Sequence, residues 1–117
     1  MALVDHQPEA LAALDRVLDR ARAVVDPGLW SLVTQRIEHT VAGGPEPEAP
    51  HSEAEVAACA VIEQMLVDVA GLDDSTVRHA SDVLGGGTLA DLVMASYAYE
   101  AATRLRVAGS RLLGVGA

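Results

Sequence analysis

The sequence lacks phenylalanine, lysine and asparagine, and the first two absences exclude particular kinds of packing and chemistry. With no Phe, one Trp and two Tyr in 117 residues, the core has to be built from small aliphatic side chains, which favours closely packed helices. All eight basic residues are Arg, so neither a Schiff base nor a lysine general base is available.

Cysteine is nearly absent as well. Cys59 is the only one, which excludes within one chain an intramolecular disulfide, a Cys-x-x-Cys redox pair and a thiolate zinc cluster. The four histidines show no His-x3-His spacing and no recurring spacing with carboxylates, so we expect no metal site made within one chain and no cofactor. A metal site that bridges two subunits stays open at this point.

Positive charge is also scarce. Seventeen acidic residues against eight basic residues give a net charge of −9, whereas nucleic acids and anionic membranes bind basic surfaces, so we expect neither as a partner. No apolar run approaches the roughly 20 residues of a membrane span, and no basic region precedes a long apolar stretch at the amino terminus. We therefore expect a cytoplasmic protein, and the abundance of Ala, Gly, Val and Arg suggests a bacterial source.

Apolar residues that recur every three or four positions predict two helices in the first third of the chain. The first spans residues 8–25, with a proline in its first turn. Asp26 offers an N-cap to the second, which spans 27–42 and stops at a pair of glycines. The segment 43–51, GGPEPEAPH, contains three prolines and two glycines, so we expect a linker there.

Further helices are expected after the linker. An S-x-x-E capping box opens a helix over 52–71, and two aspartates can cap a short helix over 73–84. The glycines at 85–87 then break the chain before a long helix over 89–113. No stretch shows the sustained period-two alternation of a strand. We predict an all-α fold, a compact bundle of four to five helices, with residues 1–117 forming one helical domain.

Two parts of the sequence resemble one known superfamily. The block from Ser52 to Leu84 precedes a Gly/Thr turn and a long helix that contains Tyr99, Arg104 and Leu105. Upstream, the segment LVTQRI includes Arg36. These features are similar to the carboxy-terminal part and the motif-leading helix of the alkyl hydroperoxidase D and carboxymuconolactone decarboxylase superfamily. The resemblance implies a carboxymuconolactone decarboxylase-like core and assembly through these helices into dimers, trimers or hexamers.

The sequence departs from this superfamily at its redox positions. Ser31 stands where the family pattern has its proton-relay Glu, and Gly43 and Glu46 stand where it has the two motif cysteines. The motif asparagines of the long helix are replaced by Glu100 and Thr103. The helix that carries Cys-x-x-Cys is missing, and the linker takes its place. The resemblance therefore implies a diverged member without the family's thiol peroxidase mechanism.

Four residues are candidates for a catalytic site. Arg36 and His39 lie near the end of the second helix, where a histidine beside carboxylates could act as a general acid or base, although a charged helix end is usually solvated. Tyr99 and Glu100 lie in the long helix, where Glu100 could exchange a proton in a pocket with Tyr99 orienting the ligand. The alternative is a structural ion pair between Glu100 and Arg104, which are spaced i, i+4.

Two functions compete on this evidence. In the first, the protein binds or transforms a small carbonyl, lactone or carboxylate metabolite by cofactor-free acid/base chemistry. In the second, it is a non-catalytic structural subunit that pairs with itself or with a related subunit. Either way we expect an oligomer, because a chain this short with 50% apolar residues has more apolar helix surface than one copy can cover.

Overall fold

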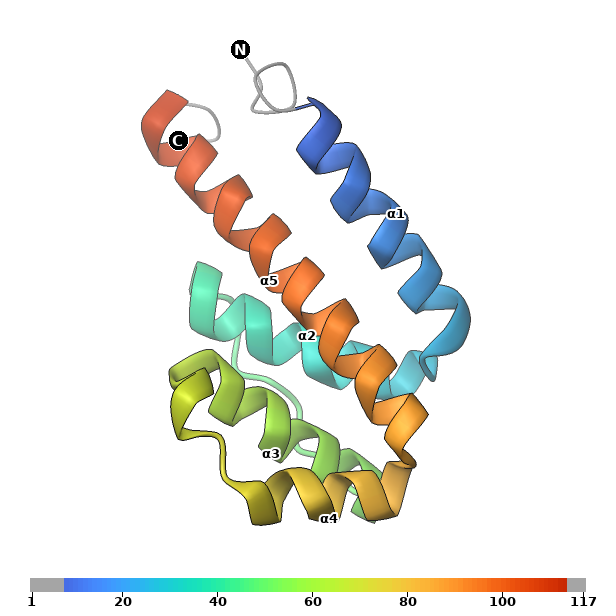
Figure 1. Cartoon of the computed structure of the whole chain (residues 1–117). Coiled ribbons are helices and arrows are strands. Elements are labelled where there is room, and N and C mark those ends of the chain that lie inside the picture. Colours follow the sequence, from blue (N-terminus) through green and yellow to red (C-terminus); the bar gives the residue numbers. More distant parts are fainter. Residues whose placement is uncertain (1–7, 114–117) are drawn as a thin grey trace.

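The computed structural model describes residues 8–113, which form five α-helices and a single turn of 3₁₀-helix (Figure 1). The elements are α1 (Pro8–Val24), α2 (Pro27–Ala42), α3 (Glu53–Val67), η2 (Val69–Gly71), α4 (Asp74–Leu84) and α5 (Gly86–Leu113). No strand occurs within these residues, so the predicted all-α class is confirmed. None of these helices combines the length and the apolarity that crossing a membrane requires.

The helix starts follow from local capping chemistry. The Asp26 carboxylate accepts a hydrogen bond from the backbone N–H of Leu29 at 2.9 Å and so caps α2. Ser52 and Glu55 form the reciprocal capping box at the start of α3, with bonds of 3.0 and 2.9 Å. Asp73 caps α4. The predicted starts of these three helices are therefore confirmed within one or two residues.

Three details differ from the sequence-based expectation. The long helix α5 begins at Gly86 instead of residue 89, because glycines in the first helical turn need no intrahelical N–H partner, and only Gly85 interrupts the chain. The helix α3 ends at Val67 instead of Gly71, where Asp68 caps the 3₁₀ turn. The spacing of Val56, Cys59 and Ile62 predicts that Val56 is buried, but its side chain is 50% exposed because α3 buries its other face against α2 and α4.

The helix α5 occupies the middle of the bundle (Figure 1). It packs against α1, α2 and α4, while α3 packs between α2 and α4. The core between α2, α3 and α5 is aliphatic, and its largest fully buried hydrophobic residues are Val33, Ile37, Val61, Ile62 and Leu92. The small residues Ala95 and Ala98 are buried on α5, which is what the scarcity of aromatic residues led us to expect.

The linker between α2 and α3 returns along α2, so the two helices run in the same direction (Figure 1). It is reached through Gly43, whose φ of 71° is the left-handed conformation of a helix C-cap. The N–H groups of Gly43 and Gly44 both donate to the carbonyl of Glu38 and so close the end of α2. Residues 43–51 contain no helix, as predicted.

Replacing two glycines by alanine should have opposite effects on stability. Gly43→Ala should lower the free energy of unfolding by about 1 to 2 kcal/mol, because a Cβ disfavours the left-handed backbone. Gly87→Ala should raise it by up to about 0.5 kcal/mol, because Gly87 is helical and a Cβ there meets open space. Urea unfolding measures both. Equal effects of the two substitutions would contradict the assigned backbone conformations.

Candidate functional site

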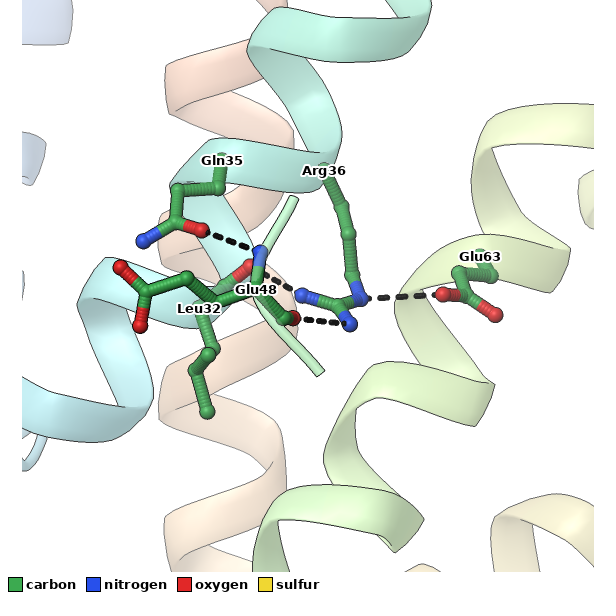
Figure 2. A network of polar contacts seen from close by, with 5 residues as sticks. All are labelled: Leu32, Gln35, Arg36, Glu48 and Glu63. Atoms are coloured by element: carbon green, nitrogen blue, oxygen red, sulfur yellow. Dashed lines mark hydrogen bonds and ion pairs between the residues drawn. The ribbon is translucent and has the colours of Figure 1, made fainter. Parts of the chain in front are cut away.

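Arg36 points away from solvent and is only 6% exposed. Its Nε donates to Oε1 of Glu63 on α3 at 2.9 Å (Figure 2). Its Nη1 donates to the carbonyl oxygen of Leu32 at 2.9 Å, and its Nη2 donates to the carbonyl oxygen of Glu48 at 2.8 Å. The guanidinium therefore links α2, the linker and α3 with all three of its nitrogens.

The residue before Arg36 completes this contact with the linker. Oε1 of Gln35 accepts the backbone N–H of Glu48 at 2.8 Å, so residues 35 and 36 together satisfy both backbone polar groups of Glu48 (Figure 2). Because the Glu63 side chain is 58% exposed, its ion pair with Arg36 is partly screened by water. The bonds from Arg36 to the two carbonyl oxygens are less screened, because the guanidinium that makes them is buried.

Tyr99 takes part in a second network, between α2 and α5. Its hydroxyl donates to Oε1 of Glu38 at 2.8 Å, and Arg106 donates to both carboxylate oxygens of Glu38 at 3.1 and 2.8 Å. The ring of Tyr99 meets the indole of Trp30 edge to face, with the ring centroids 5.7 Å apart. The carboxylate of Glu38 is thus shared between a tyrosine and an arginine.

This sharing shifts two pKa values. Burial alone would raise the pKa of Glu38, but the hydrogen bonds from Tyr99 and Arg106 and the positive charge of Arg106 together lower it below 4.5. For Tyr99, burial, the hydrogen bond to Glu38 and the negative charge of Glu38 raise the pKa to about 12. At neutral pH the carboxylate is therefore ionised and the phenol protonated, which is the arrangement that stabilises their hydrogen bond.

The other two candidate residues lie apart from these networks. Glu100 is shielded, with its side chain 17% exposed, and it accepts two hydrogen bonds from Arg104, so the structure contains the i, i+4 ion pair. His39 is exposed, and its Nδ1 lies 2.9 Å from the carbonyl oxygen of Gly44. Among residues 8–113, no hydrogen bond or ion pair joins any two of Arg36, His39, Tyr99 and Glu100.

Three surface depressions lie on the described part of the chain, away from Tyr99 and Glu100. One depression lies between α2 and the linker, and its lining includes Thr34, Gln35, Glu38, Glu46 and Glu48. Two others lie on α3 with η2 and between α1 and α5. Neither Tyr99 nor Glu100 lines any of these three.

Sequence reasoning missed the contacts of Glu38 with Tyr99 and Arg106, and it did not single out Arg106 at all. The bonds of Glu38 join residues 61 and 68 positions apart, and no local spacing reports such pairs. One signal was available on α5: Tyr99, Thr103 and Arg106 follow one another at four and three positions and share one face of the helix. Thr103 is buried on that face, which marks it as the side packed against α2.

A thiol nucleophile and a bound metal ion are two further ways to build a reactive centre. Cys59 is buried, and desolvation raises the pKa of its thiol, which disfavours a nucleophilic thiolate. Residues 8–113 bring no three His, Cys, Asp or Glu side chains into position to hold a metal ion. No protein family, curated protein or solved structure matches this chain.

Replacing Arg36 by methionine should reveal its structural role. Arg36→Met keeps an unbranched side chain but removes the side-chain donor to the carbonyls of Leu32 and Glu48, and the Glu48 carbonyl then has no donor, so we expect a loss of roughly 2 to 3 kcal/mol in the free energy of unfolding. Arg104→Met is the matched control. Arg104 is 57% exposed and pairs only with Glu100 on its own helix, so the loss should stay within about 0.5 kcal/mol. Similar losses for the two variants would refute the role of Arg36.

Tyr99 should keep its proton to unusually high pH. Because the pKa of Tyr99 is raised to about 12, the folded protein keeps this proton at pH values where the unfolded chain loses it. The free energy of unfolding should therefore fall between about pH 10 and pH 12, and Tyr99→Phe should flatten this fall. At pH 7 the same variant should lose about 1 to 2 kcal/mol, the cost of one bond to a carboxylate. The ultraviolet titration of the native protein minus that of Tyr99→Phe isolates this phenol, and its ionisation near pH 10 would contradict the contact with Glu38.

Proposed function

We infer that the protein is a non-catalytic subunit that acts by associating with a second copy of itself. The observation that carries this inference is that polar side chains are bonded within the chain while apolar side chains are exposed. Arg36 and Tyr99, two of the four candidate residues, are engaged inside the fold, whereas several large apolar side chains remain exposed to solvent.

The polar side of the inference rests on two residues. Arg36 uses all three guanidinium nitrogens on protein acceptors, so binding a substrate carboxylate or carbonyl would break structural bonds. The Tyr99 hydroxyl is held by Glu38, which in turn is paired with Arg106. A general acid or base must reach its substrate within hydrogen-bonding distance, and these groups already have partners within the chain.

The apolar side rests on α1 and α5. Val17 and Val24 of α1 and Met94 and Tyr97 of α5 are all exposed, the largest fraction being 64% for Met94. Single exposed apolar residues are common, but four on two adjacent helices form a surface that a partner chain can cover. Association through such a surface is the expected solution for a small chain with an aliphatic core.

The superfamily resemblance supports this proposal through the divergence that it implies. In a diverged alkyl hydroperoxidase D-like chain with a carboxymuconolactone decarboxylase-like core, the motif helix would be replaced by the linker of residues 43–51. Position 43 is a left-handed helix cap and position 46 lies in non-helical linker. Loss of the redox helix leaves the assembly role as the property such a chain can keep.

Binding of a small metabolite is the second candidate, and the depression beside Glu38 is the feature that favours it. Three of its lining side chains are glutamates, which repel a carboxylate metabolite. A carbonyl or lactone oxygen needs a donor, and both ends of the Gln35 amide are engaged, with Glu48 and with Ser31. The depression therefore supports this candidate less well than the exposed helices support association.

Light scattering tests the proposed association directly. The purified protein at micromolar to hundred-micromolar concentration should have a mass that is a multiple of 12.2 kDa. Glu100→Gln should leave that mass unchanged, because Glu100 pairs only with Arg104 of its own helix. A monodisperse species of one chain mass over this range would refute the proposal. Turnover of a carbonyl or lactone metabolite that Glu38→Gln abolishes would instead favour the second candidate.

A further inference from the structure

The charge of the chain is divided unevenly between two groups of helices. The helices α1 and α5 carry six arginines against five acidic residues, a net charge of +1. The segment 26–85, which contains α2, α3 and α4, carries eleven acidic residues against two arginines, a net charge of −9. Two copies with this distribution repel each other least when their α1 and α5 helices meet.

The same two helices border an open groove. Val17, Arg20 and Val24 of α1 line it from one side, and Asp91 and Met94 line it from the other. All five residues are exposed. Within residues 8–113, neither Arg20 nor Asp91 joins an ion pair, whereas Arg22, Arg104 and Arg106 each do. The groove thus combines uncovered apolar side chains with one unpaired charge of each sign, one on each of its helices.

We propose that a second copy of this chain docks on the α1/α5 groove, with the twofold axis of the dimer running along the groove. This inference rests on the proposed function and specifies its surface. A twofold axis in this direction places α1 of one protomer over α5 of its partner. Arg20 then faces Asp91 of the partner subunit, and the same contact repeats on the other side of the axis. The exposed valines and Met94 lie about one helical turn along the groove from the ion pairs.

The helix directions agree with this arrangement. Within one chain α1 and α5 run antiparallel (Figure 1). The proposed axis makes α1 antiparallel to α5 of the partner subunit as well, so that the four helices form a bundle in which every neighbouring pair is antiparallel. A twofold axis perpendicular to the groove would instead place α1 against α1 and Arg20 near its own copy. The charges therefore select one of the two twofold arrangements.

Charge reversal tests this surface. In Arg20→Asp two acidic pairs face each other across the dimer, and in Asp91→Arg two arginine pairs do, so each variant alone should weaken the dimer about tenfold or more in dissociation constant. Mixing the two variants should restore the dimer as a heterodimer, because every contact is then between opposite charges. The double variant Arg20→Asp/Asp91→Arg should likewise dimerise within about threefold of the native chain. Sedimentation equilibrium measures all four.

Two control variants carry matched changes in net charge. Arg78→Asp and Asp82→Arg alter exposed residues of α4, away from the groove, and should change the dissociation constant by less than threefold. A native dimer that the groove variants weaken no more than these controls, or variants that fail to form a heterodimer, would overturn the proposed surface and leave self-association standing. A native chain that stays monomeric would overturn both.

Discussion

The buried guanidinium of Arg36 is the interaction on which the arrangement of the chain depends. A linker rich in proline and glycine has few backbone bonds of its own, yet this one has to return along α2 and deliver α3 to its place. Arg36 and Gln35 hold it by both backbone groups of Glu48, and Glu63 ties the same guanidinium to α3. Three segments thus share one buried cation, and no buried side-chain nitrogen or oxygen in residues 8–113 is left without a partner.

The pairing of these polar groups supports the proposed non-catalytic role. Its two interhelical networks, at Arg36 and at Glu38, connect α2 with α3 and with α5, and they engage two of the four candidate residues, Arg36 and Tyr99. The groove between α1 and α5 is lined by exposed apolar side chains, and the charges of these two helices nearly balance. The acidic residues are concentrated on the other helices.

The sequence predicted the helices well because their ends are set by local chemistry. Asp26 and Ser52 cap helices through residues only three positions away, so the pattern alone identifies them. The site was less accessible, since Arg36 contacts residues 12 and 27 positions away and Tyr99 one 61 positions away. Such pairings depend on how helices pack, and a charged or aromatic residue in a helix pattern does not reveal its distant partner. The pair of Glu100 with Arg104 was predictable because it is local.

Hydrogen exchange at Glu48 tests the anchoring of the linker most directly. The account predicts that the amide of Glu48, which donates to Gln35, exchanges measurably more slowly than the amides of Glu46 and Ala49, for which the structure provides no acceptor within residues 8–113. Nuclear magnetic resonance resolves these amides individually. Exchange of all three at the rate of an unstructured peptide would mean that the linker is not held by α2, and would contradict its anchoring by Gln35 and Arg36.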